Sequence, residues 1–143
     1  MQTIVFDMDN TLVDEFGATV RPGIVQVLTQ LKQEKKILHL WTSSTKDRAR
    51  QILKDHKLDS FFVSGLYRED YDRDNKGNRK DIRRVNADSI VDDDPAEITF
   101  AESIGKKGFL ISPYRRNSKE DKEEIARLLK FLSQKSGFFA RFS

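Results

Sequence analysis

Short apolar runs that end in polar or acidic residues recur along this chain, and they constrain its fold more than any other feature. Residues 2–6 (QTIVF) lead into an acidic turn, residues 36–41 (KILHLW) lead into Thr42, and residues 89–91 (SIV) lead into three aspartates. Helical patterns separate these runs, so strands and helices alternate along the sequence. This alternation predicts an α/β fold, a Rossmann-like parallel sheet with helices on both faces.

The remaining elements are predicted from apolar spacing and from boundary residues. Helices are predicted at residues 24–36, after Ser44 or Thr45, at residues 95–104 and at residues 118–135. Further strands are predicted at residues 60–67 and 107–112, an exposed loop at residues 68–81 and a short helix at residues 81–86. Pro22 suits the first position of the first helix. Ser118 and Asp121 fit a capping box at the start of the last one.

The length and composition favour one soluble domain. The chain has 143 residues, 37% of them apolar and 34% charged, with a net charge of +3. We expect a single domain over residues 1–143, with an aromatic tail at residues 136–143 after the C-terminal helix. No apolar run approaches the roughly 20 residues of a membrane span, and no signal peptide is recognisable. Because the chain has no cysteine, we expect a cytoplasmic location, without membrane contact.

Acidic and hydroxyl side chains follow the predicted strands directly. They are Asp7, Asp9, Thr42, Ser43, Asp92 and Asp93. Because the carboxyl ends of parallel strands form the ligand-binding edge of such sheets, we expect these side chains to lie close together. Two like unit charges about 4 Å apart repel by roughly 4 kcal/mol at an effective dielectric near 20, so the cluster needs a compensating cation, a proton or water. Acids from two strand ends could share a Mg²⁺ ion, and one aspartate could attack phosphorus.

Four ordered motifs resemble those of the haloacid dehalogenase (HAD) superfamily, whose members are mostly phosphatases. FDMDNTLV matches its DxDxT signature, and ILHLWTSS looks like its second motif, which ends in Thr42. Lys80 in NRKDI looks like the lysine of the third motif, and SIVDDDP looks like the fourth. The chain is most similar to the capless NLI-interacting-factor-like branch, which includes the RNA polymerase C-terminal-domain phosphatases. It offers DMDNTLV, RPG, LWTSSTKDRA, GLYRED, RKDI and DDDP in that branch's order, over roughly residues 3–112.

The resemblance implies a catalytic role for each matching residue. Asp7 would be the nucleophile, and Asp9 would be the general acid for the leaving oxygen and then the general base for water. Thr42, with Ser43 beside it, would hydrogen-bond the phosphoryl oxygens. Lys80 would neutralise those oxygens and orient Asp7. The interval from Lys80 to the fourth motif is shorter than in the relatives, so Lys76 is the alternative motif lysine.

The resemblance also implies a Mg²⁺ site. Asp7 and the backbone carbonyl of Asp9 would bind the ion, and Asp92 and Asp93 would complete its coordination. Because neighbouring side chains of an extended segment point opposite ways, we expect Asp93 to be the direct ligand and Asp92 the second. Thr11 is expected to hydrogen-bond the turn rather than to take part in catalysis.

These features together predict a Mg²⁺-dependent phosphatase that works through an aspartyl-phosphate. No interval between the motifs is long enough for a cap domain, and an open site suits a bulky phosphate ester such as a phosphoprotein. A nucleic-acid-end phosphatase or a small-metabolite phosphatase is the alternative. A non-catalytic binding module on the same fold is a further alternative. The basic side chains of residues 68–84 leave nucleic-acid contact open, although interleaved acids weigh against it.

Overall fold

A five-stranded parallel sheet forms the centre of the computed structural model, which describes residues 2–116 and 121–133. Its strands are β1 (Thr3–Phe6), β2 (Ile37–Trp41), β3 (Ser64–Leu66), β4 (Ser89–Asp92) and β5 (Lys107–Leu110). Their spatial order is β3-β2-β1-β4-β5, so the chain moves outward from β1 to β3 and then returns to the other side of β1. The order therefore reverses between β1 and β4, where ligands bind in open α/β sheets. The predicted α/β fold is confirmed.

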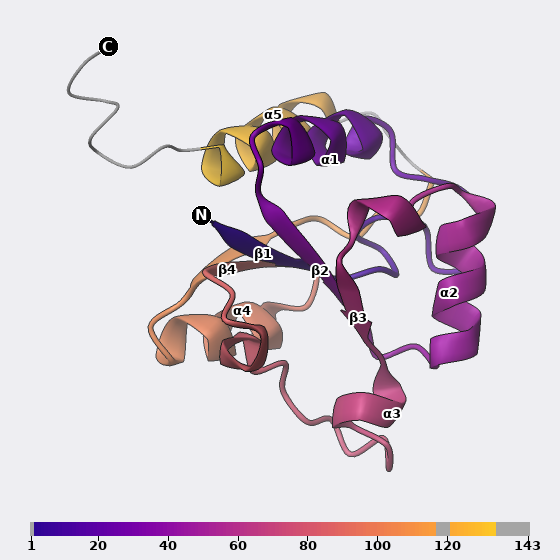
Figure 1. Cartoon of the computed structure of the whole chain (residues 1–143), viewed down its shortest axis with the longest axis vertical. Helices are drawn as coiled ribbons and strands as arrows, with labels where there is room; N and C mark the ends of the chain where they lie inside the picture. Colours follow the sequence, from indigo (N-terminus) through magenta and orange to yellow (C-terminus); the bar gives the residue numbers. More distant parts are fainter. Residues whose placement is uncertain (1, 117–120, 134–143) are drawn as a thin grey trace.

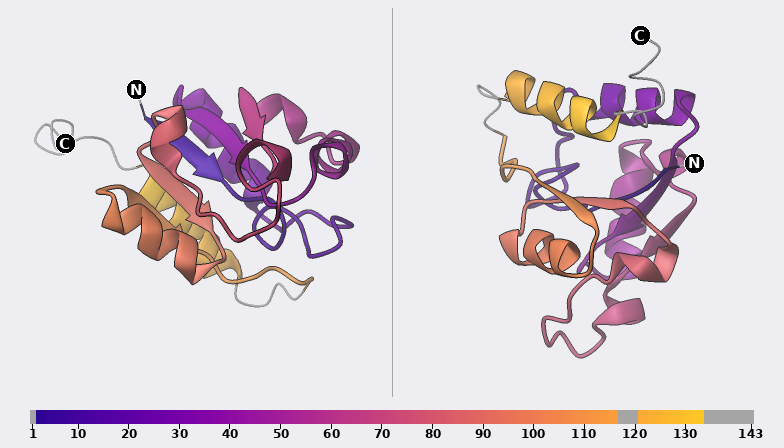
Figure 2. Two further views of the ribbon diagram at one scale, coloured as in Figure 1. Left: turned by 90° about the horizontal axis from the view of Figure 1, so that it is seen from below. Right: turned by 90° about the vertical axis from the view of Figure 1, so that its left-hand side faces the viewer.

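Helices cover both faces of the sheet (Figures 1 and 2). They are α1 (Ile24–Gln33), α2 (Lys46–Asp55), α3 (Arg68–Tyr71), α4 (Pro95–Ser103) and α5 (Asp121–Leu132), with short 3₁₀ turns η1 (Asp59–Phe61) and η2 (Ile82–Val85). In Figure 1, α1 and α5 lie side by side above the sheet and α4 lies below it. No helix of residues 2–116 and 121–133 is long and apolar enough to cross a membrane.

The two cores follow from the alternation of side chains along the strands. On β1, Ile4 and Phe6 point into the core formed with α1, α2 and α5, whereas Val5 points into the core formed with α4 and η2. All three side chains are fully buried. Because parallel strands covered on both faces are apolar throughout, a short run such as Ile4–Phe6 can be predicted as a central strand.

The predicted first helical position at Pro22 is wrong. Helix α1 begins at Ile24, and Gly23 precedes it with φ of +87°, a left-handed conformation that glycine adopts without a steric penalty. The amide of Ile24 donates to the carbonyl oxygen of Arg21 at 3.2 Å, so Pro22 and Gly23 form a turn rather than the first turn of the helix.

The segment around β3 also differs from the prediction. The strand predicted at residues 60–67 is reduced to Ser64–Leu66, because residues 59–61 form a 3₁₀ turn. The exposed loop predicted at residues 68–81 contains the short helix α3 and two buried side chains, Asp72 and Lys80. Asp72 is buried because its carboxylate accepts hydrogen bonds from the amides of the turn that follows it.

Other boundaries differ by one to three residues, as is common where helices fray and strands end. The predicted strand at residues 107–112 ends at Leu110, and the first helix ends at Gln33. The C-terminal helix is described over Asp121–Leu132, whereas the predicted cap at Ser118 and the tail at residues 136–143 lie outside the described residues. The described ranges contain no inserted cap domain between the predicted motifs.

Candidate active site

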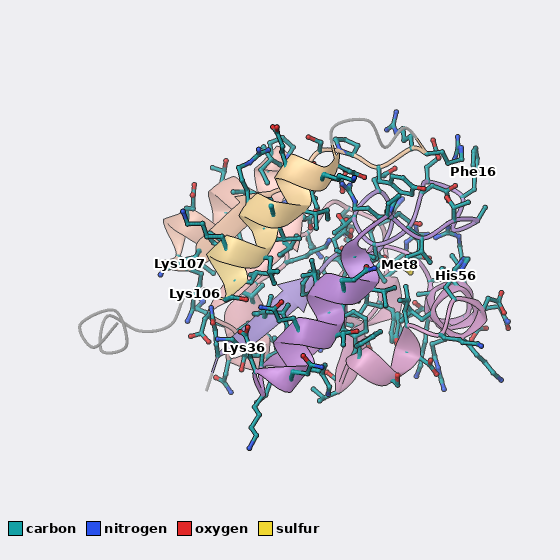
Figure 3. The ribbon with its side chains drawn as sticks, turned by 90° about the horizontal axis from the view of Figure 1, so that it is seen from above. Met8, Phe16, Lys36, His56, Lys106 and Lys107 are labelled. Atoms are coloured by element: carbon teal, nitrogen blue, oxygen red, sulfur yellow. The ribbon has the colours of Figure 1, made fainter. Side chains whose placement is uncertain are left out.

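The carboxyl ends of the strands bring the predicted site residues together. In Figure 3, Lys36, Lys106 and Lys107 lie on the side where β2 and β5 begin, and Phe16 lies on the opposite side, in the loop that follows β1. The polar residues that follow β1, β2 and β4 lie at that second edge and border a cavity of about 300 Å³. The predicted site residues on this border are Asp7, Asp9, Ser43, Lys80, Asp92 and Asp93.

A buried lysine joins two buried aspartates at the centre of the site. The Lys80 ammonium lies 3.0 Å from Asp7 Oδ1 and 2.7 Å from Asp92 Oδ2. Lys80 is 4% exposed, Asp7 7% and Asp92 1%, so the three charges meet away from bulk water. Lys76 is exposed on the preceding loop and does not contact either carboxylate. The geometry therefore favours Lys80 over Lys76 as the motif lysine.

These carboxylates have strongly altered acidities. Burial raises the pKa of Asp7 to about 7, although the Lys80 charge acts in the opposite direction. Burial and the neighbouring Asp7 charge raise the pKa of Asp92 to about 6. Burial alone would lower the pKa of Lys80, but the charges of Asp7 and Asp92 raise it above its usual range. Lys80 is therefore a permanent cation that only partly offsets the negative charge around it.

The arrangement of the carboxylates fits a divalent cation. One carboxylate oxygen from each of Asp7, Asp92 and Asp93 lies within 4.8 Å of the others. With all three carboxylates ionised, they and Lys80 leave an excess of two negative charges, which a Mg²⁺ ion would neutralise, and oxygen ligands are those that this ion prefers. Burial, the largest cause of the raised pKa values of Asp7 and Asp92, disfavours their ionised forms, and a bound cation would favour them.

Asp92 and Asp93 differ in how they are engaged by the protein. Asp92 accepts from Lys80 through Oδ2 and from the amide of Asp94 through Oδ1, at 2.7 and 3.0 Å. We expected neighbouring side chains to point opposite ways, as they do in an extended strand. Strand β4 ends at Asp92, so this alternation does not extend to Asp93, and both carboxylates reach the cluster. Asp94 has a structural role instead, because it caps α4 by accepting a hydrogen bond from the amide of Ala96 at 2.9 Å.

Asp9 borders the cavity but is not part of the three-carboxylate cluster. Its carboxylate accepts two hydrogen bonds from the Arg48 guanidinium, at 2.9 and 3.0 Å. Arg48 lies on α2, so the first motif and the helix after the second motif are tied together at the mouth of the site. The sequence contained no local signal for this pair, because the two residues are 39 positions apart.

The hydroxyl side chains of Thr11, Thr42 and Ser43 have different contacts at the site. Thr11 is fully buried and donates to Asp7 Oδ2 at 3.0 Å, so it hydrogen-bonds within the acidic turn, as expected, and its partner there is the predicted nucleophile. Thr42 is also buried and caps the end of β2, since its Oγ1 accepts from the amide of Ser44 at 3.0 Å. Ser43 borders the cavity, whereas Thr42 is not on its border. The hydrogen of the Thr42 hydroxyl stays available for donation, because this bond uses only its oxygen.

Two further buried charged residues support the site. Glu97, in the first turn of α4, accepts from the amide of Lys80 at 3.0 Å and thereby holds the backbone that carries the ammonium. Arg21 donates to the carbonyl oxygens of Asn10 and Thr11, both at 2.8 Å, and to Asp121 at 2.9 Å, which fixes the loop after β1 against α5. Glu97 could have been noticed as an acid in a first helical turn. The contacts of Arg21 depend on the fold.

Asp14, the third acid of the opening motif, belongs to the loop rather than to the site. Its carboxylate accepts from the amides of Phe16 and Ala18 and from Arg116, at 3.2, 2.7 and 2.8 Å. Burial would raise the pKa of Asp14, but the hydrogen bonds from Arg116, Ala18 and Thr19 lower it to about 2. Asp14 therefore shapes the loop that lies beside Asp9.

Comparisons with solved structures agree with this architecture. A putative beta-phosphoglucomutase from Thermotoga maritima superposes with a TM-score of 0.69 at 16% identity, covering 92% of this chain and 99% of that one. A HAD-superfamily hydrolase from Ehrlichia chaffeensis gives 0.61 at 13% identity, with 90% and 99% coverage. D,D-heptose 1.7-bisphosphate phosphatase from B. bronchiseptica, complexed with magnesium and phosphate, gives 0.53 at 17% identity, with 77% and 80% coverage. At sequence identities this low, the structural similarity shows a shared fold.

Sequence comparisons identify the family. An uncharacterized 41.0 kDa protein of Cryptophlebia leucotreta granulosis virus is 39% identical over 61 residues, which are 41% of this chain and 18% of that protein. The chain thus matches less than a fifth of the length of that relative. Residues 2–141 match the family described as NLI interacting factor-like phosphatase. The chain therefore belongs to the NLI interacting factor-like phosphatases, a family of phosphoric monoester hydrolases with the HAD fold.

Proposed function

We propose that this protein is a Mg²⁺-dependent phosphatase that hydrolyses phosphomonoesters through an aspartyl-phosphate at Asp7. The observation that carries the proposal is the contact of the buried Lys80 ammonium with Asp7 and Asp92, beside Asp93, on the border of the cavity. A positioned oxygen nucleophile with positive charge beside it is what phosphoryl transfer requires. Membership of a phosphatase family supports the same reaction class.

Asp7 and Asp93 would hold the Mg²⁺ ion directly, with Asp92 as the further acid of the site. The Asp9 backbone carbonyl would be the remaining protein ligand, as the family resemblance implies. When bound, the ion would neutralise negative charge on the phosphoryl oxygens. Its presence would also reduce the repulsion among the three carboxylates, which Lys80 alone offsets only in part.

The side chains of the chain account for both halves of the reaction. In the first half, an Asp7 oxygen bonds to phosphorus, the bond from phosphorus to the leaving oxygen breaks, and Asp9 gives that oxygen a proton. In the second half, Asp9 takes a proton from water as the water oxygen attacks phosphorus, and phosphate leaves Asp7. Lys80 and Thr11 hold the Asp7 carboxylate in place throughout, because each donates to a different oxygen of it. Thr42 and Ser43 would hydrogen-bond the phosphoryl oxygens.

The proposed substrate is a bulky phosphate ester such as a phosphoprotein. Support comes from the mouth of the site, since residues 2–116 and 121–133 contain no cap domain over it. The turn of residues 72–79 contributes Asn75, Gly77 and Asn78 to the border of the cavity. A site without a cap domain suits a phosphate ester carried on a macromolecule.

The proposal is tested by phosphatase assays of the wild type and of Asp7→Asn with Mg²⁺ and with EDTA. The substrates are para-nitrophenyl phosphate, a phosphopeptide, a 5′-phosphorylated oligonucleotide and a sugar phosphate. We expect hydrolysis that requires both Mg²⁺ and Asp7, fastest with the phosphopeptide, and a hydroxylamine-sensitive phosphate on the peptide that contains Asp7. Asp59→Asn, which changes an exposed acid on η1, is the matched control and should retain activity. Hydrolysis that persists in Asp7→Asn would refute the mechanism, and no hydrolysis of any substrate by the wild type would favour a binding module.

A further inference from the structure

Arg48 connects three segments at the mouth of the site. Its Nη1 donates to Asp9 Oδ2 at 2.9 Å and to Ser44 Oγ at 3.0 Å. Its Nη2 donates to Asp9 Oδ1 at 3.0 Å and to the carbonyl oxygen of Glu15 at 3.5 Å. The guanidinium therefore fixes the Asp9 carboxylate relative to both the loop after β1 and the residues that follow β2.

The pair has a defined orientation with respect to the cavity. Asp9 borders the cavity and Arg48 does not, so Arg48 holds the carboxylate from outside the space that a phosphate ester would enter. Among the described residues, Arg48 supplies the only hydrogen bonds to the Asp9 side chain. A carboxylate has about four lone-pair sites, so two parallel bonds leave one site on each oxygen for another partner.

The ion pair between Arg48 and Asp9 is not explained by folding stability. The Arg48 side chain is 40% exposed and that of Asp9 is 26% exposed, and ion pairs with such exposure contribute little to folding. The need to place the Asp9 carboxylate accurately explains the pair better. A general acid must lie within hydrogen-bond reach of the oxygen that it protonates, and a displacement of about 1 Å can cost roughly 100-fold in rate.

We propose that Arg48 is a positioning residue that orients Asp9 for proton transfer to the leaving group. This inference rests on the proposed function, because it requires Asp9 to be the general acid. It adds a residue of α2 to the site, and it predicts a specific kinetic signature. The proton from Asp9 matters when the leaving oxygen is strongly basic, as in an alkyl phosphate. It matters little when the leaving group departs readily as an anion, as in 2,4-dinitrophenyl phosphate.

The test compares kcat/KM for these two substrates, because kcat/KM reports the steps up to the transfer of the phosphoryl group to Asp7. For Arg48→Ala we expect a loss of about 10- to 100-fold with the alkyl phosphate and less than about 3-fold with 2,4-dinitrophenyl phosphate. Asp9→Asn should show the same selectivity with a larger loss. Arg48→Lys should rescue the alkyl phosphate reaction in part, because an ammonium supplies charge without the planar fork.

Arg50→Ala is the matched control, since Arg50 lies two residues further along α2 and borders a different cavity. It should leave both kcat/KM values unchanged. Equal losses with the two substrates in Arg48→Ala, or no loss with either, would overturn the positioning role. An Asp9→Asn variant without leaving-group selectivity would overturn it as well, by removing Asp9 as the acid. Failure of the proposed function is recognised separately, by hydrolysis that survives Asp7→Asn.

Discussion

Replacing the nucleophile should stabilise the metal-free protein. In Asp7→Asn the amide has nearly the shape of the carboxylate, and it can accept from Lys80 and donate to Thr11. The variant lacks only the charge. Burial raises the pKa of Asp7 from 3.8 to about 7, so the ionised form is disfavoured in the folded state even though Lys80 lies beside it. The uncharged Asn side chain avoids the free-energy cost of holding a buried negative charge.

The magnitude follows from the difference in pKa between the folded and unfolded states. Between pH 3.8 and about 7 the folded protein holds a proton that the unfolded chain has released, so the free energy of unfolding of the wild type falls as the pH rises through this window. Each pKa unit is equivalent to about 1.36 kcal/mol, which gives a total of about 4 kcal/mol above pH 7. At pH 5 less than half of this cost applies, so the advantage of Asp7→Asn should grow by about 2–3 kcal/mol from pH 5 to pH 8.

The assay is urea unfolding of both proteins in EDTA at pH 5 and pH 8, repeated at pH 8 with Mg²⁺. Added Mg²⁺ should stabilise the wild type more than the variant and so reduce the difference, because the ion binds the folded carboxylates. Asp59→Asn should change the free energy of unfolding by less than about 0.5 kcal/mol at either pH. A gain in Asp7→Asn that is equal at pH 5 and pH 8, or a loss at pH 8 in EDTA, would refute the electrostatic account of this site.

Three other substitutions test the groups that support the site. Lys80→Met should abolish measurable activity, which enzyme assays measure. It should also lower the free energy of unfolding by about 3–5 kcal/mol at pH 8, measured by urea unfolding, because it leaves buried carboxylates without a cation. Arg21→Ala should destabilise by a similar 3–5 kcal/mol or so, since it leaves Asp121 without its buried partner, and a loss below about 1 kcal/mol would contradict this. Glu97→Ala should destabilise by about 1–3 kcal/mol by leaving the Lys80 amide unpaired, whereas Glu97→Gln should keep that bond, so equal losses in the two variants would show that the bond is not the cause.

The sheet and its acidic edge could be predicted because both depend on local pattern and on one topological rule. Apolar runs such as Ile4–Phe6 are long enough only for strands, and strands that alternate with helices form parallel sheets. In a parallel sheet all carboxyl ends meet at one edge. The placement of Asp7 and Asp92 at one edge of the sheet therefore followed from sequence, although 85 positions separate them. That they also meet depends on β1 and β4 being neighbours in the sheet, which the structure shows.

The contacts within that edge were decided by the tertiary structure. The turn of residues 72–79 has no periodic pattern, and its course sets which lysine reaches Asp7, since Lys80 is carried into the site by a bond from its amide to Glu97. The bond from Thr11 to Asp7 depends on how the loop after β1 is folded. The pairing of Arg48 with Asp9 requires α2 to be placed beside that loop. The sequence by itself determined the main strands and helices and which residues lie at the edge of the sheet, because periodicity and the alternation of strands with helices act on whole segments. Only the tertiary structure decided which side chains hydrogen-bond to one another there, because a hydrogen bond depends on displacements of less than an ångström that no local pattern encodes.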